Sequence, residues 1–153
     1  MKTLARAADH DELRRRLASL GPEQVRRWGR MTVGQMVCHL ADSFEMALGR
    51  KPVTSRAGPL QRTLVKWLAL YAPLPWPPGI RTSPEIDQTL GQCTVPVDFE
   101  SDRARIGCLM DEMARQDAAF AWPAHPVFGP MSPAAWLRWG YLHTNHHLRQ
   151  FGV

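Results

Sequence analysis

The chain has 153 residues, of which 44% are hydrophobic and 22% charged, and its formal net charge is +5 at pH 7. This length and composition are typical of one globular domain and exclude a disordered chain. No run approaches the roughly 20 apolar residues that a membrane-spanning helix needs. The amino-terminal stretch MKTLARAADHDELRRR places charges where a secretory signal needs apolar residues. We therefore expect a single domain over residues 1–153 that is cytoplasmic.

The positive charge comes mainly from arginine, and the arginines are scattered from Arg6 to Arg149. A basic protein can bind nucleic acid, but such binding requires clustered charge or a recognisable motif. Neither is present in this chain. We expect no nucleic-acid partner and no membrane partner.

The chain has three cysteines, an odd number, and no two of them show CxxC spacing. This usage predicts neither a disulfide framework nor a thiolate zinc site. We expect Cys38, Cys93 and Cys108 to be reduced and mostly buried.

The first predicted helix runs from Asp9, interpreted as its capping residue, to Leu20. It carries leucines at helical spacing and ends at the Gly21-Pro22 pair. The second predicted helix begins after Thr32, which forms a capping-box pattern with Gln35, and Gly49 ends it. Its apolar stripe consists of Val33, Met36, Val37, Leu40, Phe44, Ala47 and Leu48.

A third helix is predicted from Leu60 to Tyr71, strongly apolar on one side, and it ends in the proline-rich sequence APLPWPPGI. The connection continues through Arg81 and Thr82 to Glu85. It is long and contains Trp76. Two interpretations stay open: the loop covers a site, or it is a rigid polyproline-like connector.

The last third of the chain predicts an extended segment over 94–99 and a helix over 100–117. The apolar positions of this helix are Ile106, Leu109, Met110 and Met113. After the linker AWPAHPVFGP, Ser132 caps and Pro133 opens a final helix that reaches about Gln150. These elements favour an all-α four-helix bundle with a long Pro-rich connection, in which the first short helix is either an addition or one of the four.

Three of the six histidines fall within YLHTNHHLRQ, on the final predicted helix. His143 and His147 are four residues apart, so their imidazoles lie side by side and can chelate one metal ion. The same stripe carries Trp136, expected to form an apolar wall, and Gly140, expected to leave room for a guest molecule. The alternative is that this spacing is incidental.

Two histidines rarely hold a metal alone, so we expect a third ligand from another helix. His39 is the best candidate, because it lies on the shoulder of the apolar stripe of the second helix, where an unpaired polar group would be costly. His10 and His125 are weaker candidates, since both lie near loops. A lone histidine such as His39 is more often a hydrogen-bonded core residue than a ligand.

Three further residues are candidates for a supporting role behind the predicted ligands. His146 projects about 100° from His147 and cannot easily share the same ion, whereas Gln150 falls on the chelating side and could orient a ligand. Asp42, one turn after His39, and Glu45 could lie near the metal as a base, but we favour a solvated position for both.

The patterns MTVGQMVCHLADSFEMAL and HxxHHLRQF, with PPGIRTSPE and HPVFGPMSPAAWLRWGYLHTNHHLRQFG, resemble the DinB/YfiT-like superfamily of metalloenzymes, in particular a domain-of-unknown-function branch of it. The resemblance covers nearly the whole chain. It implies an up-down-down-up four-helix bundle, often dimeric, with a metal triad at His39, His143 and His147.

Such a site would hold a divalent metal, zinc or nickel, with a position left open for catalysis. The activities that the resemblance implies favour a thiol S-transferase with a low-molecular-weight thiol as second cofactor and a small-molecule substrate. The alternatives are a metal-dependent hydrolase and a non-catalytic helical binding or dimerisation protein. The chain has six tryptophans, several of them expected at the surface, which favours a homodimer.

Overall fold

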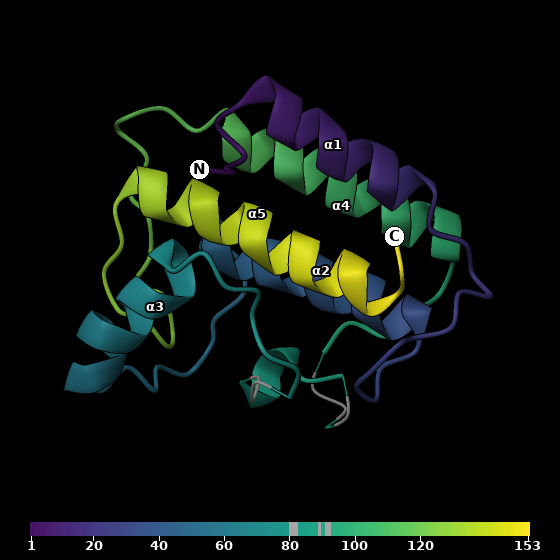
Figure 1. Ribbon diagram of the computed structural model, residues 1–153, viewed down its shortest axis with the longest axis horizontal. Helices are drawn as coiled ribbons and strands as arrows, with labels where there is room; N and C mark the ends of the chain where they lie inside the picture. The colour runs from purple at the N-terminus through teal and green to yellow at the C-terminus, as the bar shows by residue number, and fades with distance from the viewer. Residues whose placement is uncertain (80–82, 89, 91–92) are drawn as a thin grey trace.

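The computed structural model describes residues 1–79, 83–88, 90 and 93–153, and in these ranges it is all-α, as predicted. Four helices lie side by side as a bundle in Figure 1: α1 (Ala7–Ala18), α2 (Val33–Ala47), α4 (Phe99–Ala114) and α5 (Pro133–Gln150). The first short helix is thus one of the four. The up-down-down-up order stays a prediction.

The predicted helix over 60–71 lies outside the bundle, at the end where α5 begins (Figure 1). It consists of a π-helical turn, η1 (Gln61–Val65), followed by α3 (Lys66–Tyr71). In its described residues, the long connection to α4 contains one 3₁₀ turn, η2 (Pro84–Ile86). Arg81 and Thr82 of this connection lie outside the described residues.

Local capping fixes where the two helices that carry the key histidines begin. Thr32 Oγ1 accepts the Gln35 N–H (3.2 Å) and Gln35 Oε1 accepts the Thr32 N–H (2.8 Å), so the predicted capping box is confirmed. Ser132 Oγ accepts the Ala135 N–H (3.2 Å) at the start of α5. These contacts set the register of His39 on α2 and of His143 and His147 on α5.

Two predicted helix starts are wrong. Asp9 lies inside the first turn of α1 rather than before it, and its carboxylate accepts the Thr3 N–H (3.1 Å) and pairs with Lys2 (3.1 Å). The helix predicted over 100–117 begins at Phe99, because Asp98 caps it by accepting the Ser101 N–H (2.9 Å), and it ends at Ala114. Residues 94–98 form no strand.

The core lies between the four bundle helices and contains the predicted stripes of α2 and α4. Gly140 belongs to this core rather than to a guest site. A Cβ placed there would lie 2.7 Å from Leu4 Cδ1 and 3.3 Å from Met113 Sδ, so its missing side chain lets packed residues approach. Trp136 is likewise fully buried in the core and stacks on Trp122.

The apolar side of the η1–α3 segment is largely exposed, with Leu70 its one buried member. The exposed apolar side chains are Leu60, Leu64, Trp67, Leu68 and Tyr71. A homodimer could cover them, and the homodimer stays a prediction. None of the helices in the described ranges is long and apolar enough to cross a bilayer.

The three cysteines are free, as expected. Cys38 is buried and Cys93 is half-buried, but Cys108 is exposed, so the expectation of mostly buried cysteines is wrong for Cys108. Burial raises the pKa of the Cys38 thiol to about 12, with nearby Asp102 the second cause. Cys38 is therefore a neutral packing group at physiological pH.

Candidate metal site

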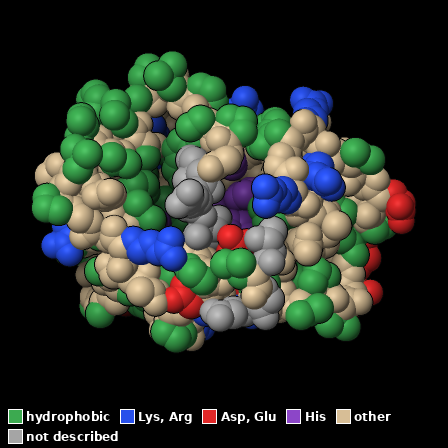
Figure 2. All heavy atoms as spheres, turned by 90° about the horizontal axis from the view of Figure 1, so that it is seen from below, with side chains coloured by type: hydrophobic (Ala, Val, Ile, Leu, Met, Phe, Trp, Pro, Cys, Tyr) green, Lys and Arg blue, Asp and Glu red, His purple; other side chains and the backbone are tan. Residues whose placement is uncertain are grey.

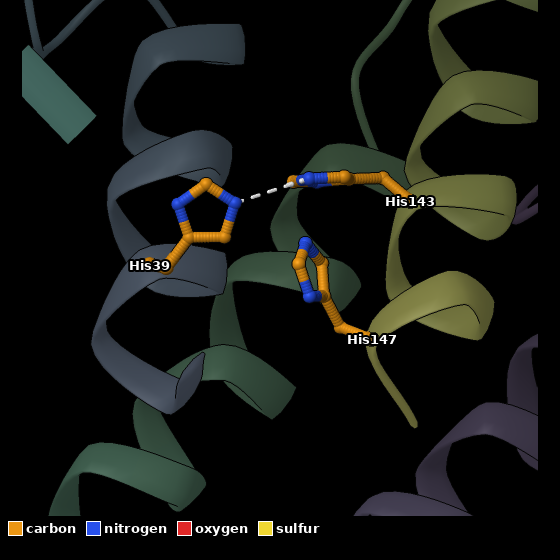
Figure 3. Close-up of side chains that lie close together, drawn as sticks. All are labelled: His39, His143 and His147. Atoms are coloured by element: carbon orange, nitrogen blue, oxygen red, sulfur yellow. Dashed lines mark hydrogen bonds between the residues drawn. The ribbon is translucent and has the colours of Figure 1, made fainter. Parts of the chain in front are cut away.

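Three histidines from two helices meet at one point of the bundle. Figure 3 shows His39 on α2 facing His143 and His147 on α5, and one ring nitrogen from each lies within 4.8 Å of the others. The Nε2 atoms of His39 and His143 are 3.3 Å apart. The structure thus brings together the three residues that the sequence singled out, in a geometry that could hold one metal ion.

Two of these rings are oriented from behind by hydrogen bonds. His39 Nδ1 lies 2.8 Å from the Ile86 carbonyl oxygen, which can only accept, so the proton is on Nδ1 and the Nε2 lone pair faces His143 Nε2, 3.3 Å away. His147 Nδ1 lies 2.8 Å from Gln150 Oε1. The Gln150 amide is itself held, because its Nε2 donates to the Trp28 carbonyl (2.9 Å). This is the arrangement that metal-binding histidines require.

The protonation state of the triad also suits a metal. Burial is the main cause that lowers the pKa of His143 and of His147 well below 6.5, and neighbouring histidines lower both further. Burial also lowers the pKa of His39, although the Ile86 carbonyl opposes this. Neutral imidazole is the form that donates a lone pair to a metal ion. His143 Nδ1 is buried without a partner among the described residues.

The triad lines a cavity of about 720 Å³. Figure 2 looks onto its opening, in which histidine side chains are visible beside Lys and Arg side chains. The described walls are mostly apolar and include Trp28, Met31, Trp76, Phe128 and Trp139. This is the character of a small-molecule site. The interior in front of the histidines is therefore not filled by side chains. A purely structural role for the histidines predicts a filled interior, so the cavity argues against that role.

Trp76 decides between the two interpretations of the Pro-rich connection. Its ring centroid lies 6.0 Å from those of His143 and His146, and its indole N–H donates to the Ala69 carbonyl (2.7 Å). The connection therefore covers the histidines on one side. A connection that served only as a spacer would not need an aromatic side chain against the histidines.

The residues predicted to support the metal ligands differ in where the structure places them. Gln150 contacts His147, as described above. His146 is not part of the triad, and its ring lies 6.0 Å from the rings of both Trp28 and Trp76. His146 also lines the cavity, and its place outside the triad agrees with the predicted 100° offset from His147.

The solvated position favoured for Asp42 is wrong. Its side chain is buried and accepts the Thr94 N–H (2.9 Å) and hydroxyl (2.6 Å), and it pairs with Lys51 (2.8 Å). Asp42 thus links α2 to Lys51, shortly after the end of the helix, and to Thr94 in the connection before α4, and its described hydrogen bonds include none to an imidazole. Glu45 is half-buried and pairs with Arg105 (2.9 Å).

The remaining histidines do not join the triad. His10 pairs with Asp111 (3.1 Å) on the far side of the bundle core. His125 lines the cavity, where its ring packs against Trp139 at 5.3 Å between centroids. It sits in a loop between α4 and α5, so no helical periodicity could have assigned it to the site.

Sequence reasoning also missed Trp139 and Asp87. Trp139 stacks on His143 with 4.9 Å between ring centroids and an interplanar angle of 20°, which holds that ring from the side. Its place one turn before His143 was a usable signal. Asp87 is the one carboxylate among the described residues that line the cavity. It lies in the loop after η2, where nothing in the sequence marks it.

The geometry agrees with the comparison of this chain with known protein families. The family model described as the DinB superfamily matches residues 5–151. The chain belongs to the DinB superfamily. Searches of curated proteins and of solved structures found no match. For this DinB superfamily member, membership and the three-histidine cluster together are compatible with a metal-dependent enzyme.

Changing Gln150 to leucine is expected to weaken metal binding by the cluster by roughly 10- to 100-fold, because His147 loses the acceptor that orients its ring. Competition with a chromogenic chelator measures this affinity. Arg149→Gln, at the exposed neighbouring position, is the matched control and should bind metal as the wild type does. Equal affinity of all three proteins would show that the Gln150 contact does not orient a ligand.

Proposed function

We propose that this protein is a metal-dependent enzyme that binds one divalent ion, zinc or nickel, through His39, His143 and His147. The observation that carries the proposal is the meeting of three neutral imidazoles within 4.8 Å at the wall of an open cavity. A structural metal site would be closed by a fourth protein ligand, whereas three imidazoles leave a position for a substrate.

The activity we propose is transfer of a low-molecular-weight thiol to a small-molecule electrophile. When bound, a divalent ion would stabilise the thiol as its thiolate at neutral pH. Trp76 and Trp139 would exclude water from this position, since both rings contact His143. Asp87, a carboxylate residue that lines the cavity, would accept the proton that the thiol loses. We place the reaction in the cytoplasm, where thiols are kept reduced, with no nucleic-acid or membrane partner.

The second candidate is a hydrolase, because the same residues could activate water. Asp87 favours it equally, as a proton acceptor for either nucleophile. A non-catalytic binding or dimerisation role is less favoured, because such a role does not need a cavity of about 720 Å³ in front of the histidines.

The proposal is tested by loading the protein with zinc or nickel and measuring turnover of an aryl halide electrophile with a thiol, and of an aryl ester without one. Thiol-dependent turnover supports the transferase, and ester cleavage without thiol supports the hydrolase. We expect Asp87→Asn to lower kcat by about 100-fold or more with the metal content unchanged. Asp11→Asn, an exposed carboxylate on α1, is the matched control. If the metal-loaded protein turns over neither substrate, the proposal that the protein is an enzyme loses its support.

A further inference from the structure

His125 organises a tight turn on the cavity wall. Its backbone pairs with Gly129 in both directions, through N–H···O contacts of 2.9 and 2.8 Å. Its ring nitrogen Nδ1 accepts the backbone N–H groups of Val127 and Phe128, each at 3.1 Å. The residue is 5% exposed, and its ring packs against Trp136 and Trp139 at the wall of the cavity.

These contacts fix the position of the proton on the ring. A backbone N–H can only donate, so Nδ1 is unprotonated, and the neutral ring carries its hydrogen on Nε2. Burial lowers the pKa of His125 to about 3, so the ring is neutral at physiological pH. Nε2 has no hydrogen-bond partner in the described part of the chain, and the residue lines the cavity.

The ring lies close to the candidate metal site without being part of it. Trp139 contacts both histidines, with 5.3 Å between its ring centroid and that of His125 and 4.9 Å to that of His143. A ligand held at the triad therefore extends along the wall that His125 shares. Because His125 lines the cavity, an acceptor oxygen of a ligand bound there could pair with its Nε2–H.

We propose that the Nε2–H of His125 donates a hydrogen bond to a carboxylate or carbonyl oxygen of the substrate. The other end of this ligand lies at His39, His143 and His147. His125 binds the substrate and takes up no proton. The inference rests on the proposed metal site for the position of that other end. It narrows the substrate class to thiols or electrophiles that carry an oxygen acceptor. The turn requires only Nδ1 of the ring, so it leaves Nε2 without a structural role.

The roles of the two ring nitrogens of His125 can be distinguished by substitution. In His125→Asn the amide oxygen stands near the place of Nδ1, so the acceptor for the turn is kept and the Nε2–H donor is lost. In His125→Gln an amide N–H can reach the place of Nε2, but the turn loses its acceptor. A purely structural role predicts that the glutamine variant is the more damaged in binding, whereas a binding role predicts the opposite.

The first experiment is ¹⁵N NMR of histidine-labelled, metal-free protein between pH 5.5 and 8. We expect His125 to show the Nε2–H tautomer throughout, with no titration. The second uses the cobalt-loaded protein, whose thiolate charge-transfer band reports binding of 3-mercaptopropionate and of 1-propanethiol, a matched thiol without a carboxylate. We expect the wild type to prefer 3-mercaptopropionate by about tenfold, the contribution of one hydrogen bond to a charged group.

His125→Asn should abolish this preference while cobalt content and 1-propanethiol affinity stay unchanged. His125→Gln should keep part of the preference, with a lower Tm. A proton on Nδ1, or an asparagine variant that retains the tenfold preference, would overturn the inference. Absence of the charge-transfer band in the wild type would instead overturn the proposed metal site, and the tautomer measurement, which needs no metal, would still test His125.

Discussion

Replacing His143 and His147 together with alanine is expected to reduce bound metal from near one ion per chain to none. The variant leaves a single imidazole, His39, at the site, and one neutral imidazole binds a divalent ion too weakly to survive purification. The measurement is elemental analysis of protein purified without an affinity tag or chelator, repeated after reconstitution with zinc or nickel.

The control for this experiment is His10→Gln. His10 lies on α1 and pairs with Asp111, so its loss changes the number of histidines but not the cluster. The control should hold metal as the wild type does, and a 100-fold excess of metal over its Kd should stabilise both by about 2.7 kcal/mol. The alanine variant should show no such stabilisation. Near-stoichiometric metal in the alanine variant would place the site elsewhere in the chain.

The helices of the bundle were predictable because the signals that set them are local. Thr32 and Ser132 cap the helices that they precede, and apolar stripes mark the buried faces of α2 and α4. The η1–α3 segment shows the limit of this reasoning. Its apolar stripe resembles a core face, yet only Leu70 is buried, because burial depends on how the bundle closes rather than on the segment itself.

The site was predictable to the extent that helical spacing encodes it. The four-residue spacing of His143 and His147 places them together on any helix, whereas their approach to His39 depends on the packing of α2 against α5. Asp87 and His125 lie in loops without periodicity, so no pattern could place them in the cavity. The error at Gly140 has the same origin, because sequence does not say whether a gap faces a guest or a neighbouring helix.

The role of Asp42 was missed for a related reason. A carboxylate one turn from a predicted ligand looks like a candidate base or a solvated group, and both views consider only its own helix. Two partners determine the environment of Asp42. Thr94 lies far away in sequence, and Lys51 lies beyond the end of the helix. Pairing with the half-buried Lys51 and accepting two hydrogen bonds from Thr94 let this charged group lie inside the fold.

The metal-free protein is expected to lose stability as the pH falls below 6.5, with His125 a principal cause. Its pKa is about 3 in the folded state against 6.5 in the unfolded state, and burial is the reason. Above pH 6.5 the ring is neutral in both states, so stability does not depend on it. Between pH 6.5 and 3 the unfolded state binds a proton that the folded state excludes, so each pH unit costs about 1.4 kcal/mol.

The contribution of His125 is therefore about 2 kcal/mol of lost stability at pH 5. His143 and His147, whose pKa values burial also lowers, act in the same direction. Urea unfolding of the metal-free wild type and of His125→Asn, followed by circular dichroism at pH 7.5 and 5, measures the effect. The asparagine keeps the acceptor of the turn and removes the titrating ring, so its loss of stability should be about 2 kcal/mol smaller. Equal losses in the two proteins would mean that His125 takes up its proton in the folded state, and its ring would then be open to water rather than enclosed against Trp136 and Trp139.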